Sequence, residues 1–300
     1  MLNKMEKSLA LGVDIGGSHI TVAMVDLKTK KLLEHSVIRS AIDSEDKSEV
    51  ILSAWASLIH SALKNVERKD KSIGIAIPGP FDYDKGVSLI KDQAKFRSLY
   101  QINVKQELAD RLDMPAENIH FINDATGFLH GELFAGAGTK VGNVLGLTLG
   151  TGLGSSVCIE QVVSDADLWN SKFIDGIAED YLSTRWFVNR YYALTGKHIL
   201  GVKDIVGLEN TDRFAVQLFM EFGINLARFL IPVINRLMID KVILGGNIAK
   251  AFSCFAPELI ANLKGNKIEV DIKVSELNEH AALVGAASCC IKTNAIPNDR

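Results

Sequence analysis

Two glycine turns, each placed between apolar segments, contain the residues of this chain best suited to hold phosphate groups. The first turn is Asp14-Ile15-Gly16-Gly17-Ser18, and the second is Gly150-Thr151-Gly152-Leu153-Gly154. Backbone N–H groups exposed in such turns attract anions. Asp14, at the mouth of the first turn, has the carboxylate needed to hold a cation over a phosphate. Considered alone, the first turn is equally consistent with an ordinary glycine-containing β-hairpin.

The two turns belong to longer segments that are similar to each other. LGVDIGGSHITVAMV, from Leu11, and LGLTLGTGLGSSVCI, from Leu145, place apolar residues and turn glycines at nearly the same positions. Thr148 occupies the position that Asp14 has in the first copy. We interpret the similarity as an internal repeat of one supersecondary unit, the alternative being chance similarity between two hairpins. Two such turns facing each other would hold the phosphates of one nucleotide.

A carboxylate is also needed to take the proton from a hydroxyl group that accepts a phosphoryl group. Asp124 is the best candidate, because it follows a short apolar strand, Ile119–Ile122, and begins a predicted helix. Aspartate is also a favoured helix N-cap, and for Asp124 alone that structural role is the stronger interpretation. Catalysis by Asp124 requires that its side chain turns towards the ligand.

The elements that must position these residues alternate between strands and helices. Predicted strands are the two arms of the hairpin within 9–25 and the segments 32–39, 73–77, 119–122, 144–149, 155–160, 241–244 and 268–275; predicted helices are 44–68, 104–112, 124–134, 179–195, 212–238, 249–263 and 280–292. The pattern restarts after residue 122, and no segment has the composition of a linker. We therefore expect an α/β protein with two tightly packed halves and a ligand cleft between them.

Composition excludes several classes of function. The 300 residues are 47% hydrophobic and carry a net charge of −3, so no basic excess indicates binding to nucleic acid or to an anionic membrane. The four cysteines lack metal-ligand spacing and are typical of a reducing cytoplasm. No apolar run approaches about 20 residues, and no signal peptide or P-loop motif is present, so we expect a cytoplasmic protein without a membrane span.

Five motifs follow one another along the chain: Asp14–Ser18, Pro78-Gly79-Pro80, Asn123-Asp124-Ala125 followed by Glu132, Leu149–Gly154, and Leu244-Gly245-Gly246-Asn247. Each is moderately specific by itself, and five in this order at these distances are strongly specific together. They are similar to the motifs of the ROK family of sugar kinases and regulators, within the hexokinase and actin-like ATPase superfamily. The resemblance covers essentially the whole chain.

This resemblance implies a duplicated ribonuclease-H-like α/β fold, the actin-like ATPase fold. Its two domains, residues 1–122 plus 281–300 and residues 123–280, would enclose a hinged cleft. The implied activity is ATP-dependent phosphorylation of a hexose or N-acetylhexosamine with Mg²⁺. The family also implies a homodimer.

The resemblance assigns roles to individual residues as well. Asp124 becomes the general base on the sugar hydroxyl, and Asn123, Gly79 and Glu179 become sugar-binding residues. Asp14 would lie beside the Mg²⁺, directly or through water. The residues that would bind the nucleotide are Asp14, Gly16, Gly17, Ser18, Gly150, Thr151, Gly152, Gly245, Gly246 and Asn247.

One segment departs from the family pattern. Most members carry ExGH and then a cysteine-rich zinc loop, CxCGxxGCxE, whereas this chain reads CIEQVVSDADLWNSKFIDGIAED from Cys158. We therefore expect no zinc site, and a His and a Glu that normally contact the sugar are missing. Candidate replacements are Asp165, Asp167, Trp169 and Asn170. Trp169 would stack on a sugar face, although a buried core tryptophan is the commoner role.

The divergent segment leaves other functions open beside an ATP-dependent sugar kinase. A non-catalytic sugar or nucleotide sensor on the same scaffold is one alternative. A polyphosphate-dependent sugar kinase is another, because Asp175-Gly176 resembles a pair found in zinc-free relatives that use that donor. The family's regulators carry a DNA-binding domain before the first phosphate motif, and only about eight residues precede the first predicted strand here. We therefore expect no nucleic-acid partner.

Overall fold

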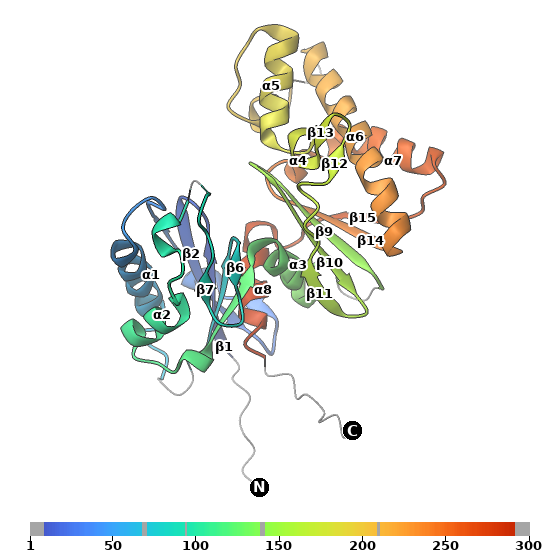
Figure 1. The fold of residues 1–300 in the computed structure, drawn as a ribbon. Coiled ribbons are helices and arrows are strands. Elements are labelled where there is room, and N and C mark those ends of the chain that lie inside the picture. The colour runs from blue at the N-terminus through green and yellow to red at the C-terminus, as the bar shows by residue number, and fades with distance from the viewer. Residues whose placement is uncertain (1–8, 68–70, 94, 139–141, 209–210, 292–300) are drawn as a thin grey trace. The chain divides into compact units, whose positions relative to one another are not determined.

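The computed structural model describes residues 9–67, 71–93, 95–138, 142–208 and 211–291 (Figure 1). The chain divides into unit 1, which comprises Met1–Ala135 and His280–Arg300, and unit 2, which comprises the residues between them, 136–279. The outer ends of the first predicted domain, residues 1–8 and 292–300, lie outside the described residues.

Unit 1 is built on a sheet whose strand order is β3-β2-β1-β5-β8, with β4 also paired to β2. The strands are β1 (Leu9–Ile15), β2 (His19–Asp26), β3 (Lys31–Leu32), β4 (Ile38–Ala41), β5 (Ile73–Ile77) and β8 (Ile119–Asn123). β1 and β2 form the predicted antiparallel hairpin. β1 is parallel to β5, and β5 is parallel to β8, so these three strands end at the same edge of the sheet.

Helices cover both faces of the unit 1 sheet, with α1 (Ser48–Ala62) and α2 (Val104–Leu112) on one face and α3 (Asp124–Ala135) and α8 (Ala281–Ser288) on the other (Figure 1). Val13 and Ile15 join the core that contains α1 and α2. Because side chains alternate along a strand, Gly12 and Asp14 lie on the opposite face. A Cβ built on Gly12 would lie 2.2 Å from the carbonyl oxygen of Leu283 in α8. The absence of a side chain at Gly12 therefore lets α8 approach the sheet.

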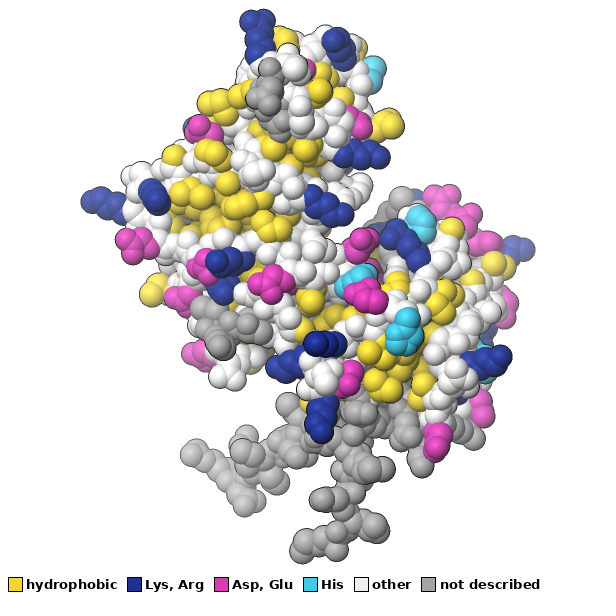
Figure 2. Space-filling view, turned by 180° about the vertical axis from the view of Figure 1, so that it is seen from behind, with side chains coloured by type: hydrophobic (Ala, Val, Ile, Leu, Met, Phe, Trp, Pro, Cys, Tyr) yellow, Lys and Arg dark blue, Asp and Glu magenta, His cyan; other side chains and the backbone are white. Residues whose placement is uncertain are grey.

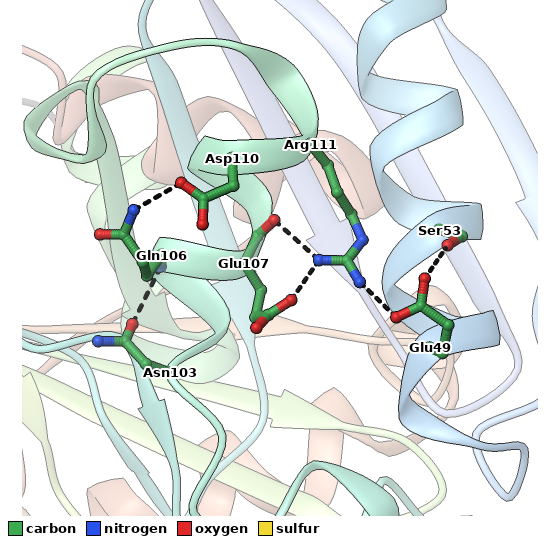
Figure 3. A network of polar contacts seen from close by, with 7 residues as sticks. All are labelled: Glu49, Ser53, Asn103, Gln106, Glu107, Asp110 and Arg111. Atoms are coloured by element: carbon green, nitrogen blue, oxygen red, sulfur yellow. Dashed lines mark hydrogen bonds and ion pairs between the residues drawn. The ribbon is translucent and has the colours of Figure 1, made fainter.

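Arg111 connects the two helices on the other face of unit 1. Its guanidinium donates to Glu49 of α1 at 2.5 Å and also bonds the carboxylate of Glu107 within α2 (Figure 3). Asn103 caps α2, accepting from the backbone N–H of Gln106 at 3.0 Å. These contacts fix α2 against α1 on the side of the sheet away from Asp14.

Unit 2 contains a second sheet, with strand order β11-β10-β9-β14-β15. The strands are β9 (Val144–Leu149), β10 (Leu153–Ile159), β11 (Val162–Asp165), β14 (Lys241–Gly245) and β15 (Asp271–Val274). The helices are α4 (Ala178–Tyr181), α5 (Thr184–Thr195), α6 (Arg213–Leu237) and α7 (Phe252–Gly265), whose apolar faces share one core with the sheet.

The two sheets have the same topology, which confirms the internal repeat. β9 pairs antiparallel with β10 and parallel with β14, as β1 does with β2 and β5. Thr148 and Asp14 take equivalent places, each one residue before the end of the first strand of its hairpin. The duplicated α/β fold is therefore present in the chain.

Helix α6 is long and apolar enough, by length and composition alone, to cross a membrane. The sequence analysis predicted this helix but counted no apolar run of about 20 residues, because Glu221 and Arg228 interrupt it. Half of its most apolar window is buried inside the protein, and residues such as Phe219 and Phe222 belong to the unit 2 core. That burial is typical of the core helix of a globular protein.

Several predicted elements differ from those observed. The predicted strand 32–39 is interrupted by a 3₁₀ turn, Glu34–Ser36, between β3 and β4. The predicted helix 179–195 is split into α4 and α5. The backbone N–H of Thr184 donates to the carbonyl oxygen of Gly150 at 2.7 Å instead of to a residue of the preceding turn. Two short hairpins, β6–β7 (Phe81–Asp82 with Val87–Ser88) and β12–β13 (Lys172–Phe173 with Gly176–Ile177), were not predicted.

Helix α3 belongs to unit 1, whereas the sequence analysis placed its residues in the second domain. The predicted domain boundary falls between residues 122 and 123, whereas the units divide after Ala135. The cause is the close packing of α3 on α8. A Cβ built on Gly285 would lie 1.8 Å from the carbonyl oxygen of Gly127, so the two helix backbones are in direct contact.

Candidate active site

The first glycine turn connects the hairpin strands β1 and β2 in unit 1. Gly16 donates its backbone N–H to the carbonyl oxygen of His19 at 2.9 Å, which closes the turn. The carbonyl oxygen of Ser18 accepts from Ile42 N at 2.9 Å, which ties the turn to the end of β4. Within the described part of the chain, no protein group accepts a hydrogen bond from the N–H of Gly17 or Ser18. The turn therefore has backbone donors available for an anion.

Asp14 lies beside this turn at the edge where the parallel strands end. It pairs in register with Ala76 of β5, which pairs with Ile122 of β8, two residues before Asp124. Burial, and after it the neighbouring Asp124 carboxylate, raise the pKa of Asp14 to about 7, while Arg39 acts in the opposite direction. The predicted cation-binding and proton-accepting carboxylates are thus brought together in unit 1.

The hydrogen bonds at the start of α3 bear on the two roles that the sequence left open for Asp124, helix N-cap and general base. Asn123 is the residue before the helix, and its Oδ1 accepts from the backbone N–H of Ala125 at 2.9 Å and of Thr126 at 3.1 Å. Asn123 therefore performs the N-cap function. Asp124 accepts from Ala125 N at 2.9 Å, and the residue is exposed. An exposed carboxylate at this edge is accessible to a substrate.

Tyr83 belongs to the same group, although sequence reasoning did not select it. Its hydroxyl accepts from Nδ2 of Asn123 at 3.2 Å and donates to the carbonyl oxygen of Ile77 at 3.3 Å. A Cβ built on Gly79 would lie 3.1 Å from the same hydroxyl. Tyr83 therefore connects Gly79 to Asn123. The only local signal was a tyrosine three residues after the Pro78-Gly79-Pro80 motif.

The second glycine turn lies in unit 2 and is held by Glu179, near the end of the divergent segment, and by Thr184, which follows it. Gly150 donates its N–H to the carbonyl oxygen of Gly152 at 3.0 Å, and its own carbonyl accepts from the hydroxyl of Thr184 at 2.9 Å. Oε2 of Glu179 accepts from Leu153 N at 3.1 Å. Oε1 of Glu179 is paired with Arg185 at 3.2 Å. Glu179, predicted as a sugar ligand, is thus placed against the predicted phosphate turn.

The Gly245-Gly246-Asn247 segment adjoins the same turn. Gly245 pairs in register with Thr148, and Ile248 donates its N–H to the carbonyl oxygen of Leu149 at 3.0 Å. Gly246 has a φ of +84°, and a Cβ there would lie 2.4 Å from that carbonyl oxygen. Both the backbone conformation and the space therefore require glycine at 246. Unit 2 thus brings together the second turn, Glu179 and the Gly245–Asn247 segment.

The residues around Asp14 fit a magnesium ion that is shared with a substrate. A cation favours the ionised form of a carboxyl group that burial and a neighbouring carboxylate otherwise hold protonated. Mg²⁺ prefers oxygen ligands and is commonly bound by one or two carboxylates together with substrate phosphates. Among the described residues, no group of three or more His, Cys, Asp or Glu side chains is placed to hold a metal ion without a substrate.

The divergent segment carries Trp169 on the surface, so the interpretation of Trp169 as a core tryptophan is wrong. Its side chain is 44% exposed. Its carbonyl oxygen accepts from Glu179 N at 3.0 Å, which places its backbone beside the predicted sugar ligand. Asp165 accepts from Asp167 N at 2.8 Å, so these two residues form a local turn at the end of β11.

The ROK family model matches residues 10–165 and 175–293. The residues left between these matches, 166–174, lie within the divergent segment. A glucokinase from Thermotoga maritima is 30% identical over 155 residues, which are 51% of this chain and only 45% of that protein. The chain thus spans less than half of the length of that relative.

Two further proteins match more of the chain. The N-acetylgalactosamine kinase AgaK from Shewanella sp. is 24% identical over 263 residues, which are 80% of this chain and 82% of that protein. The crystal structure of a ROK family glucokinase from Streptomyces griseus in complex with glucose and AMPPNP superposes with a TM-score of 0.74. It is 22% identical and covers 94% of this chain and 98% of its own, which shows a common fold.

Proposed function

Because this chain belongs to the ROK family, we propose that it is a sugar kinase that transfers the terminal phosphoryl group of ATP to a sugar hydroxyl. The observation that carries the proposal is the placement of Asp14 and Asp124 at one edge of the unit 1 sheet, beside the first glycine turn. A phosphate-binding turn, a cation-binding carboxylate and an exposed second carboxylate are the parts that phosphoryl transfer to a hydroxyl needs.

In this proposal Asp124 takes the proton of the sugar hydroxyl as the hydroxyl oxygen forms its bond to phosphorus. The bond from phosphorus to the bridging oxygen of ADP breaks, and ADP leaves with the electron pair. The capping of α3 by Asn123 supports this role, since the Asp124 side chain is not needed for the cap. Asn123, Gly79 and Glu179 bind the sugar, and Tyr83 holds the first two in place.

The nucleotide is bound by both glycine turns in this proposal. Gly17 and Ser18 of unit 1 donate backbone N–H groups to phosphate oxygens, and Gly16 closes the turn that presents them. Thr151 and Gly152 do the same from unit 2, where Gly150 closes the turn, and Gly245, Gly246 and Asn247 lie against that turn. Mg²⁺ at Asp14 neutralises the phosphate charge. The complex of the S. griseus glucokinase with AMPPNP supports ATP as the donor.

We propose a hexose or an N-acetylhexosamine as the acceptor. A glucokinase and an N-acetylgalactosamine kinase among the relatives support this range. Trp169, which is exposed and whose backbone lies beside that of Glu179, would stack its indole on the apolar face of such a sugar. The identity of the sugar then depends on the segment that the family model leaves unmatched.

The remaining expectations concern partners and location. We propose a cytoplasmic homodimer without a nucleic-acid partner, and the net charge of −3 supports the last of these expectations. On the face shown in Figure 2, basic and acidic side chains are interspersed on both units, and hydrophobic side chains gather in a patch on unit 2. Interspersed charge does not favour a polyanion such as DNA.

Two alternatives remain beside the main proposal. Loss of sugar contacts in the unmatched residues 166–174 would leave a sensor that binds ligands without transferring phosphate. Polyphosphate is the alternative donor, because Asp175-Gly176 resembles a pair found in zinc-free relatives that use it. The sensor differs from the main proposal because it transfers nothing, and the polyphosphate-dependent kinase differs only in its donor.

The deciding experiment is a screen of radiolabelled ATP with common hexoses and N-acetylhexosamines. Labelled sugar phosphate from at least one sugar supports the proposal. Nucleotide binding without transfer to any sugar contradicts it and favours the sensor. Transfer from polyphosphate but not from ATP identifies the alternative donor. Comparison with Asp124→Asn in the same screen separates the chain's own activity from a contaminating kinase.

A further inference from the structure

Arg39 lies in the same cross-strand row as Asp14 on the unit 1 sheet. In the register of the sheet, Asp14 is opposite Thr21 of β2, and Thr21 is opposite Arg39 of β4. Residues directly opposite each other on neighbouring strands direct their side chains to the same face. Strands lie about 5 Å apart, so the Cα atoms of Arg39 and Asp14 are about 10 Å apart, within reach of an arginine side chain.

The position of Arg39 next to the first turn is fixed by the backbone. β4 continues into Ile42, whose N–H donates to the carbonyl oxygen of Ser18 in the turn at 2.9 Å. The charge of Arg39 acts on Asp14, because it lowers the pKa that burial and Asp124 raise. Arg39 is itself exposed, so its guanidinium is accessible to a bound anion.

Lys95 approaches the same turn from a different part of unit 1. A Cβ built on Gly17 would lie 3.2 Å from Cδ of Lys95, so the lysine side chain lies against the backbone of the turn. The glycine at 17 provides the space for this contact. Among the described residues, no carboxylate forms an ion pair with Lys95, and its side chain is only partly buried.

The segment that carries Lys95 is anchored on the face of the sheet away from Asp14. The next residue, Phe96, is fully buried in the core that contains Val13 and Ile15, and its ring packs edge-on against Trp55 with the centroids 5.4 Å apart. Phe96 also donates its N–H to the carbonyl oxygen of Ser44 at 2.7 Å. Arg39 and Lys95 thus approach the first turn from the two sides of the sheet.

We propose that Arg39 and Lys95 flank the first glycine turn as a pair of cations that binds the terminal phosphate of a nucleoside triphosphate. The inference rests on the proposed sugar kinase function and specifies how unit 1 recognises the donor. Asp14 and Asp124 place negative charge at the edge where this phosphate must lie. Two cations aimed at that position offset the repulsion between the carboxylates and the phosphate, and they also favour the charge that develops during transfer.

Binding of non-transferable nucleotides tests this inference without requiring sugar turnover. The dissociation constants of Mg·AMPPNP and Mg·ADP are measured by calorimetry for the wild type, Arg39→Gln and Lys95→Met. Each substitution is expected to weaken AMPPNP binding about tenfold, the range of a lost charge-assisted hydrogen bond. ADP binding is expected to change less than about twofold, because ADP lacks the terminal phosphate. Lys95→Arg, which keeps the charge, is expected to retain most of the AMPPNP affinity.

Matched controls are Lys91→Met, from the same segment, and Arg236→Gln, from the end of α6. Unchanged melting temperatures show that the variants are folded. If the wild type binds AMPPNP and the two variants bind it equally well, or lose ADP affinity to the same extent, the inference is wrong while the sugar kinase proposal stands. If the wild type binds neither nucleotide, both are wrong. Selective loss of AMPPNP affinity in a protein that phosphorylates no sugar supports the donor site and contradicts only the proposed function.

Discussion

The carboxylate of Asp124 at the start of α3 lies close enough to Asp14 on β1 for its charge to raise the Asp14 pKa. The two residues are 110 positions apart in the chain, and the parallel pairing of β1, β5 and β8 brings them to one edge. Burial is the larger cause of the raised pKa, which reaches about 7. A site that disfavours the ionised carboxyl until a cation arrives is suited to binding Mg²⁺ with a phosphate.

Replacing Asp14 with Asn is expected to stabilise the free protein in a pH-dependent manner. The Asp14 carboxyl has a higher pKa in the folded state, about 7, than its ordinary value of 3.8. The folded state therefore binds more protons than the unfolded state between these values, and its stability falls as pH rises through that window. The cost is complete above pH 7 and corresponds to at most roughly 4 kcal/mol.

Urea unfolding at pH 4 and at pH 8 measures this effect. Asp14→Asn is expected to be more stable than the wild type at pH 8, by up to roughly 4 kcal/mol, and close to it at pH 4. Asp26→Asn is a useful comparison, because two backbone N–H groups of a turn lower the pKa of Asp26 and its removal should destabilise the protein above pH 4. Equal effects of Asp14→Asn at both pH values would show that Asp14 titrates normally.

Replacing Asp124 with Asn is expected to lower kcat for sugar phosphorylation by about 10²–10⁴-fold, the usual contribution of a general base. The amide oxygen retains an acceptor for Ala125 N, and the cap from Asn123 is unaffected, so folding should not change. AMPPNP affinity should stay within about threefold of the wild type. Asp110→Asn, on the surface of α2, is the matched control. A kcat within tenfold of the wild type would remove Asp124 from the chemical step.

Replacing Glu179 with Gln is expected to raise the KM for the sugar. The carboxylate accepts from Leu153 N and pairs with Arg185, so it links the second turn to α5. Arg185→Met removes the ion pair but leaves Glu179 in place. If Glu179 binds the sugar, its substitution raises KM at least about tenfold and Arg185→Met has a smaller effect. Equal changes from both variants would indicate that the ion pair only positions the turn.

Replacing Gly285 with Ala is expected to destabilise unit 1 by about 2–3 kcal/mol. The added Cβ would lie 1.8 Å from the carbonyl oxygen of Gly127, so α8 must move away from α3, and over-packing of this kind has costs in that range. Thermal unfolding measures the loss. Gly265→Ala is the control, because nothing lies within 4 Å of its Cβ position. Equal melting temperatures for both variants would show that the helices separate easily.

The sequence by itself determined the local features of this protein. Glycines between apolar strands defined both turns, and their repetition predicted a duplicated fold, which the matching strand order of the two sheets confirms. Hydrophobic periodicity located most helices and strands, because side-chain alternation and helical spacing are set by near neighbours. The short hairpins and the split between α4 and α5 were not predicted, since contacts with distant residues produce them.

Only the tertiary structure decided which residues act together. In the structure, Asn123 caps α3 and Tyr83 connects Asn123 to Gly79. The carboxylate of Glu179 accepts from Leu153 N. Helix α3 belongs to unit 1 because two glycines let its backbone meet that of α8. The Lys95 side chain packs against Gly17, and Asp14 lies near Asp124. Strand register and helix packing set these distances, and neither is encoded within a short stretch of sequence.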